Sequence, residues 1–263
     1  MSRLSIVSVA TGYGGAERSI EIIARHLPPQ FDTTIYASHP EHLARLRDAA
    51  NGRDNLRIRR LRAADDATTR RIEAMKLVID DARNEPQAIL ANTQASALLC
   101  AMAARLRPTI AQRTSLYVRD FMWRDLDYIF SRLGSPKVFV PDAVVAQRLG
   151  YLAPSYLWEG HGEVTVLPDM VELSDRPVSY EGPVLHLATV NPWKGHHHLL
   201  LAVSRLKRAG RQIELTSVGQ APDQSLLGQL KQVQQRLELE QCFHFGEFVS
   251  DPAELLRAQP KKS

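Results

Sequence analysis

The chain has 263 residues, of which 44% are hydrophobic and 24% charged, with a formal net charge of +4 at pH 7. This much apolar side chain can offset the entropy of ordering, so a mainly disordered or low-complexity chain is excluded. No window approaches about 18 consecutive apolar residues and the N-terminus lacks a signal-peptide pattern, so we expect a cytoplasmic protein. Cys100 and Cys242 lie far apart in apolar stretches. They indicate packed thiols rather than a disulfide or a zinc site.

Apolar runs alternate with helical patterns over residues 1–172. Leu4–Val9 predicts a strand and Ala16–Leu27 a helix that stops at Pro28. In the helix predicted at Thr68–Arg83, four apolar residues share one face: Ile72, Met75, Val78 and Ile79. Further strands are predicted at Thr33–Ala37, Leu56–Leu61, Ala88–Ala91, Thr109–Gln112, Lys137–Val140 and Val164–Leu167, and helices at Pro40–Ala50, Ala95–Leu106, Tyr117–Leu133 and Ala143–Leu149. Strands separated by helices predict a parallel, doubly wound sheet.

A proline- and glycine-punctuated stretch, residues 173–183, is typical of an interdomain linker. It separates the domain at 1–172 from a second alternation at 184–263. There we predict strands at Val184–Ala188, Ile213–Val218 and Cys242–Phe245, and helices at Gly195–Arg208, Ser225–Leu237 and Pro252–Arg257. Three strands and three helices are few for a free-standing doubly wound domain, so we expect the second domain to be incomplete.

A glycine-rich segment, Gly12-Tyr13-Gly14-Gly15-Ala16-Glu17, joins the first predicted strand to the first helix. Glycines let a ligand approach the backbone, and a helix start presents N–H groups and partial positive charge to an anion. The segment lacks both the third glycine of the dinucleotide fingerprint and the Gly-Lys-Ser/Thr of a Walker loop. A tight turn with Glu17 as its capping acid is the alternative interpretation.

The segment from Thr189 to His196 makes a similar junction in the second domain. Lys194 stands where a pyrophosphate would meet a helix N-terminus, although a solvated lysine before a helix is the plain alternative. His196, His197 and His198 point about 100° apart on a helix, so we expect no metal site there. Gly219 and the Phe248-Val249 pair follow later strands, at the carboxyl ends where open α/β sheets bind ligands.

The densest basic run contains Arg57, Arg59, Arg60 and Arg62. No aromatic residue lies within it, which argues against nucleic acid as a partner. Two interpretations stay open for this run: a solvated strand edge, or a patch that contacts an anionic membrane or an acidic ligand. The second would make the protein peripheral at the inner face of the membrane, with the contact through Arg57–Arg62.

Together these segments resemble the family 4 glycosyltransferases, which have the GT-B fold. Gly14 to Glu17 resembles the family's acceptor-domain loop, Val164–Glu172 the segment that enters the second domain, and Leu187–Gly195 its Gly-Arg-x-x-x-x-Lys-Gly loop. Val218-Gly219 and Phe245–Val249 resemble the strands that follow. The resemblance implies an α/β protein with two Rossmann-like, doubly wound domains that face each other across a cleft.

It also implies an activity: retaining transfer of a sugar from a UDP- or GDP-linked donor to a hydroxyl of a glycan or lipid-linked acceptor. Such an enzyme would serve polysaccharide or lipid-linked glycan biosynthesis and need no metal or other cofactor. Lys194 and Glu17 are then the candidate catalytic residues, and Lys194 would stabilise charge on the leaving phosphate. The donor-binding candidates are Gly14, Gly15, Thr189, Lys194, Gly219, Phe248 and Val249.

The sequence departs from the family pattern at several positions. Thr189 stands where the family has an arginine, and Asp169-Met170 where it has Asn-Gly. Arg113 or Thr114 occupies the region of the acceptor-side histidine. The family's paired glutamates should follow Leu255–Ala258, so we expect a truncated transferase with impaired activity. The alternative is a non-catalytic remnant or subunit that binds a nucleotide or a partner glycosyltransferase chain.

Overall fold

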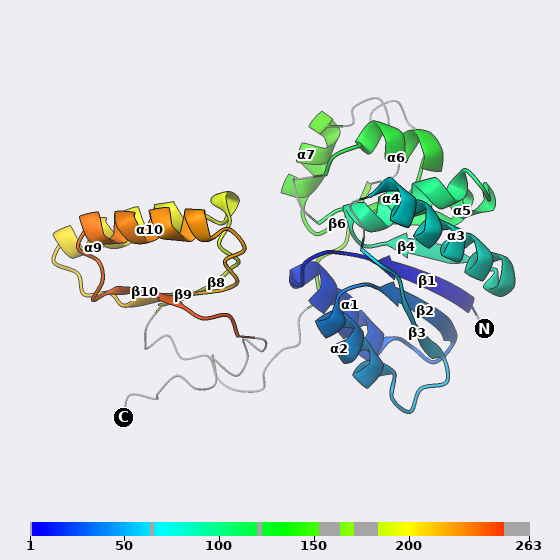
Figure 1. Cartoon of the computed structure of the whole chain (residues 1–263), viewed down its shortest axis with the longest axis horizontal. Coiled ribbons are helices and arrows are strands. Elements are labelled where there is room, and N and C mark those ends of the chain that lie inside the picture. Colours follow the sequence, from blue (N-terminus) through cyan, green and yellow to red (C-terminus); the bar gives the residue numbers. More distant parts are fainter. Residues whose placement is uncertain (1, 64–65, 120–122, 153–163, 171–183, 250–263) are drawn as a thin grey trace. The chain divides into compact units, whose positions relative to one another are not determined.

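The computed structural model describes residues 2–63, 66–119, 123–152, 164–170 and 184–249. The chain divides into two compact units, Met1–Leu173 and Ser174–Ser263 (Figure 1). The predicted linker at 173–183 and the predicted helix at Pro252–Arg257 lie outside the described residues. Within the described ranges, no helix has the length and apolar character needed to cross a membrane.

The first unit is built on a seven-stranded sheet in which all neighbouring strands are parallel. The strand order is β3-β2-β1-β4-β5-β6-β7. The strands are β1 Ser2–Ser8, β2 Phe31–Ala37, β3 Leu56–Arg60, β4 Ala88–Ala91, β5 Thr114–Tyr117, β6 Val138–Val140 and β7 Val164–Val166. The predicted doubly wound sheet is therefore confirmed for this unit.

Helices cover both faces of this sheet (Figure 1). They are α1 Gly15–His26, α2 Pro40–Ala50, α3 Ala67–Asn84, α4 Gln94–Ala104, α5 Thr109–Arg113, α6 Leu126–Leu133 and α7 Ala143–Leu152. On one face, α1 and α2 pack on β1–β3 around the fully buried Ile20, Ile35 and Leu46. On the other face, α3 to α6 enclose a larger core that includes Cys100 and Phe130. Alternate strand residues point to opposite faces, so β1 contributes Ile6 to the first core and Val7 to the second.

Two predicted elements around residue 115 are wrong. Thr109–Gln112 belongs to the helix α5, and the strand β5 follows it at Thr114–Tyr117. Tyr117 therefore ends a strand instead of opening a helix, and the next described helix begins at Leu126. The shift moves the carboxyl end of β5, and hence its ligand-facing edge, to residues 118 and 119.

The second unit has a three-stranded parallel sheet in the order β10-β9-β8. Its elements are β8 Val184–Leu187, the 3₁₀ turn η1 Pro192–Lys194, α9 His196–Arg208, β9 Leu215–Val218, α10 Gln224–Arg236 and β10 Phe243–Gly246. Both helices pack on the same core, around Leu200, Val203 and Phe243 (Figure 1). Leu206, predicted to face inward with them, is 38% exposed.

Candidate functional site

The first unit has a topological switch point between β1 and β4. The chain winds from β1 through β2 to β3 on one side and from β4 onward on the other. Open α/β sheets bind ligands outside the carboxyl ends of strands at such a point. The glycine-rich segment follows β1 at this edge, and Asn92 and Thr93 follow β4.

Side chains from several elements hold the backbone of the glycine-rich segment. The Ser38 hydroxyl accepts from the N–H of Ala10 at 2.9 Å and donates to its carbonyl at 2.7 Å. Glu17 is buried and its Oε2 accepts from the Gly14 N–H at 2.8 Å. The capping interpretation of Glu17 is thus confirmed. Gly14, the N-cap residue of α1, has no side chain with which to cap the helix in turn.

Tyr13 anchors the same segment to a buried network between α1 and α2. Its hydroxyl donates to Glu21 Oε2 at 3.1 Å, and Glu21 Oε1 lies 2.8 Å from His42 Nδ1. The ring also stacks on His39 with centroids 5.6 Å apart. Burial, and next the negative charge of Glu21, raise the pKa of Tyr13 to about 12, so the phenol stays a hydrogen-bond donor. These contacts fix the segment before any ligand arrives.

Arg119 is the main charged side chain at the switch point. It follows β5 and is only 7% exposed. Its Nε donates to Asn92 Oδ1 at 2.9 Å, its Nη1 pairs with Asp169 Oδ1, and its guanidinium lies 3.6 Å from the Tyr117 ring centroid. Asn92 in turn donates to the carbonyl of Ala16 at 3.1 Å, which joins Arg119 to the first turn of α1.

One terminal nitrogen of Arg119 is left over. Nη2 is buried and has no hydrogen-bond partner among the described residues. Burial lowers the pKa of Arg119 to about 10, while Tyr117 and then Glu17 oppose this shift. A buried guanidinium with one unused donor is costly unless a further acceptor meets it. Arg119 therefore has the capacity to bind an anionic or strongly polar ligand group beside α1.

Asp169 is the acidic partner that three side chains share. Besides Arg119, its Oδ1 accepts from Ser19 Oγ at 3.2 Å and from Tyr117 Oη at 3.1 Å. A carboxylate can accept from several donors and offset the charge of the arginine. Asp169 and Arg119 are thus a matched pair in this structure.

The predicted acceptor-side residues lie elsewhere. Arg113 ends α5, at the amino end of β5, and binds Asp81 through Nη2 at 2.9 and 2.8 Å. Thr114 is buried and donates to the carbonyl of Ile110 at 2.7 Å. Both side chains are engaged at the edge of the sheet opposite the switch point. The placement of this prediction is corrected: Arg119 holds the carboxyl end of β5.

In the second unit, two loops at the carboxyl ends of β8 and β9 run against each other. Val190 N donates to Gln220 O at 2.7 Å and Ala188 N donates to Val218 O at 3.0 Å. A Cβ built on Gly219 would lie 2.0 Å from the Ala188 carbonyl oxygen. Glycine is therefore required at residue 219 by the close approach of these two backbones.

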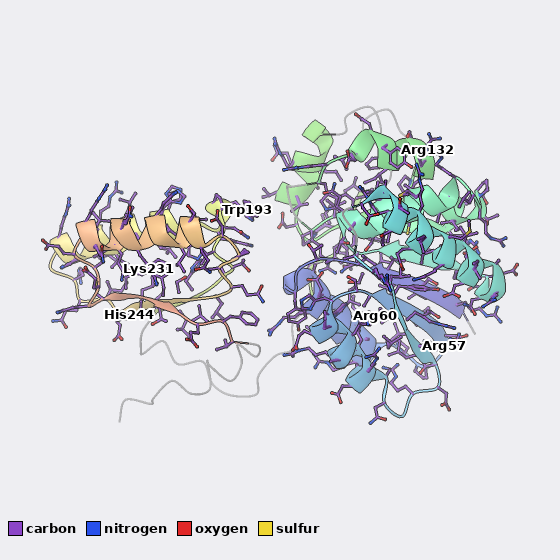
Figure 2. The ribbon with its side chains drawn as sticks, in the orientation of Figure 1. Arg57, Arg60, Arg132, Trp193, Lys231 and His244 are labelled. Carbon is purple, nitrogen blue, oxygen red and sulfur yellow. The ribbon has the colours of Figure 1, made fainter. Side chains whose placement is uncertain are left out.

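The other predicted donor-binding residues of this unit surround the same edge. Thr189 is half-buried in the loop after β8, and Lys194 is exposed at the end of η1. Gly195 adopts a left-handed conformation (φ 74°) that turns the chain into α9. Phe248, 45% exposed, and Val249 follow β10. All of these residues lie at the carboxyl edge of the three-stranded sheet, and Trp193 projects from the same turn (Figure 2).

A pair of histidines lies beneath the Lys194 loop. The rings of His186 and His196 meet edge to face at 4.7 Å, and His186 Nδ1 lies 3.1 Å from Ser217 Oγ. Burial lowers the pKa of both histidines, so both favour the neutral form. No group of three or more His, Cys, Asp or Glu within the described ranges could hold a metal ion.

Several solved glycosyltransferases of the GT-B type are similar in structure to this chain. HepE from Anabaena in complex with UDP-glucose has a TM-score of 0.69 at 18% identity, covering 97% of this chain and 71% of its own. A glycosyltransferase from Rickettsia africae scores 0.66 at 17% identity, covering 97% and 70%. Sucrose-phosphate synthase from Thermosynechococcus elongatus scores 0.65 at 13%, covering 98% and 73%. The chain has the GT-B fold. No family model and no curated protein matches the sequence.

Proposed function

We propose that this protein is a glycosyltransferase that moves a sugar from a UDP- or GDP-linked donor to an acceptor hydroxyl with retention. The observation that carries the proposal is Arg119, whose buried Nη2 has no hydrogen-bond partner within the described part of the chain. Asn92 joins this arginine to the first turn of α1. Such a cation is retained for a ligand with phosphate or hydroxyl oxygens. HepE, which shares the fold, has been crystallised with UDP-glucose, and that ligand carries both kinds of oxygen.

In this proposal the two units have different tasks. Lys194 binds the donor pyrophosphate and offsets the charge that develops on the leaving phosphate, without a metal ion. Thr189, Gly219, Phe248 and Val249 surround the nucleotide. The backbone at Gly14 and Gly15, together with Arg119, receives the sugar and the acceptor. Glu17 acts by holding the Gly14 N–H in place.

We propose a glycan or lipid-linked acceptor, and a cytoplasmic role in polysaccharide or lipid-linked glycan biosynthesis. A non-catalytic protein that binds a nucleotide or a partner glycosyltransferase chain is the second candidate. It is favoured by Thr189, because a threonine cannot replace the bidentate grip of an arginine on a pyrophosphate.

Calorimetric titration with UDP and GDP tests the donor site. The Lys194→Ala variant should lose about 1.5–3 kcal/mol of binding free energy, the range for a hydrogen bond to a charged group. Lys231→Ala, on the exposed side of α10, is the matched control and should bind as the wild type does (Figure 2). Equal affinity in all three proteins would remove Lys194 from the site.

Release of UDP or GDP from a panel of nucleotide sugars, with and without lipid-linked acceptor, tests the transfer itself. Acceptor-dependent release would support the glycosyltransferase. Nucleotide binding without release from any donor would instead favour the non-catalytic candidate.

A further inference from the structure

The helix α3 exposes apolar residues and buries acidic ones. Ile72, Met75 and Ile79 are 53%, 45% and 44% exposed, whereas Glu73 and Asp81 are 1% and 5% exposed. The buried acids are paired: Glu73 binds Lys76 at 2.7 Å, and Asp81 binds two arginines. The buried side of α3 therefore carries ion-paired acidic residues, and its exposed side carries a stripe of apolar residues.

The outward stripe also carries positive charge. Residues at i, i+3, i+4, i+7 and i+11 of a helix share one face, and from Ile72 these are Met75, Lys76, Ile79 and Arg83. The i+8 position of the same face is Asp80, so this face carries two basic residues and one carboxylate. An exposed helix face that is apolar and basic is the pattern of helices that lie in a membrane interface.

The edge strand of the sheet carries further positive charge. β3 is the terminal strand, and Arg57 and Arg60 are part of it (Figure 2). Arg57 is paired with Asp32 at 2.6 Å. Arg59 and Arg60 are exposed, and both line a groove of about 280 Å³ together with Lys76 and Ile79 of α3.

The groove contains one acid, Asp80, which faces the buried Tyr36 and helps to raise the pKa of its phenol. Arg59 and Arg60 face the groove beside Lys76, which is already paired with Glu73. The groove suits the phosphate headgroup of a lipid, and the apolar stripe of α3 beside it suits the lipid's acyl chains. Long basic side chains can keep their charge at the headgroups while their stems lie on apolar surface.

We propose that α3 and the edge of β3 form a docking surface for an anionic phospholipid bilayer. Ile72, Met75 and Ile79 insert at the boundary between headgroups and acyl chains, and Arg59 and Arg60 bind lipid phosphates. Each basic side chain near an anionic surface strengthens binding about fivefold. The proposed surface combines the basic run of β3 with the apolar stripe of α3. It does not depend on the proposed transferase activity.

Co-sedimentation of the full chain with vesicles tests this surface. The wild type should bind vesicles that contain phosphatidylglycerol and not vesicles of phosphatidylcholine alone, and added salt should weaken binding. Arg59→Gln/Arg60→Gln should lower the partition coefficient about 30-fold. Ile72→Gln/Ile79→Gln should lower it about tenfold or more, because two half-exposed apolar side chains no longer enter the lipid.

The control is Leu201→Gln on α9, a residue 47% exposed, which should bind as the wild type does. All variants change exposed side chains, so their melting temperatures should match the wild type. Absence of vesicle binding, equal binding to neutral vesicles, or binding that neither double variant weakens would overturn the proposal. A self-association that Ile72→Gln/Ile79→Gln abolishes, without vesicle binding, would overturn it in favour of an interface between copies of the chain.

Discussion

Two arginines illustrate opposite uses of a buried guanidinium. Arg113 binds Asp81 with one terminal nitrogen, Nη2, and the carbonyl of Pro86 with the other. Arg119 leaves Nη2 unpartnered in a site that burial makes unfavourable for its charge. The first arginine stabilises the fold at the amino edge of the sheet. In our proposal, the second gives up stability at the carboxyl edge for a ligand contact, a trade often seen at functional sites.

We predict that Arg119→Met and Arg113→Met separate these roles. Arg119→Met should leave the free energy of unfolding within about 1 kcal/mol of the wild type, because it also removes a desolvated charge. It should weaken UDP-glucose binding by about 1.5–3 kcal/mol. Arg113→Met should reduce the free energy of unfolding by about 2 kcal/mol or more, since Asp81 loses one cation.

Urea denaturation and calorimetry measure the two quantities. Arg113→Met should not alter the affinity for UDP-glucose. If both variants lose stability equally and bind UDP-glucose alike, Arg119 is a structural residue and has no role in the site.

Among the elements, the two loops after β8 and β9 restrict the sequence most strictly, because their close approach requires glycine at residue 219. We predict that Gly219→Ala forces this pair apart, because the added Cβ would lie 2.0 Å from the Ala188 oxygen. UDP binding should be lost, and β8 and β9 should exchange their amide hydrogens faster. In Gly228→Ala, on α10, the new Cβ meets nothing within 4 Å. That control should stabilise the helix by about 1 kcal/mol and bind UDP normally.

The histidines under the Lys194 loop predict a pH dependence for the second unit. Burial lowers the pKa of His196 and His186 in the folded state, so the unfolded chain binds more protons below its own histidine pKa of about 6.5. Stability contributed by the neutral pair is complete above about pH 6.5 and falls as the pH drops below that value. Urea titrations followed by the NMR amide signals of β9 should show this loss at about pH 5.

The matched variants are on one helix. His196→Leu should reduce the acid-induced loss, whereas His198→Leu, which changes an exposed residue, should leave it intact. An identical pH profile in all three proteins would mean that neither the burial of His196 nor its contact with His186 controls acid stability.

Periodicity predicts most of these elements but not their orientation or every boundary. Three residues of the predicted apolar face of α3 are exposed, and the buried side carries Ala74, Leu77 and Asp81. Asp81 is paired there with Arg107 and Arg113. No helical period carries information on such long-range pairs. The shift at α5 and β5 arises similarly, because a short apolar run suits either element.

That shift also hid Arg119 from sequence reasoning. An arginine after a strand is recognisable as a site residue only if the strand is placed correctly. By contrast, the glycine-rich segment, Lys194 and Gly219 were recognisable because each follows a well-placed strand, and these three do lie at carboxyl edges of their sheets. Their roles in binding stay predictions.

At the scale of the whole molecule, the two units differ in how much core supports them. The first unit has two cores, one on each face of a seven-stranded sheet, and β1 and β4 are neighbouring interior strands of that sheet. The second unit has one core on three strands, of which β8 and β10 are both edges. Edge strands and smaller cores open at lower free energy. Amides of β1 and β4 should therefore exchange slowly, and those of β8 and β10 faster.

We predict that UDP changes this pattern in the second unit alone. A ligand that binds the folded state stabilises it by mass action, by about 2.7 kcal/mol when its concentration is 100 times the dissociation constant. Peptides over residues 188–195 and 219–222 should gain protection from hydrogen exchange, because these loops are the proposed nucleotide contacts. Peptides over β9, which precedes the second loop, should gain protection with them. Peptides over β1 and β4 should not change, since their exchange is governed by the cores of the first unit.

Hydrogen exchange with mass spectrometry, in the presence of UDP and in the presence of uridine, measures these changes directly. Uridine should protect less because it lacks the pyrophosphate that Lys194 binds in the proposal. Protection confined to residues 10–17 would place the nucleotide on the first unit and contradict the proposed division of tasks.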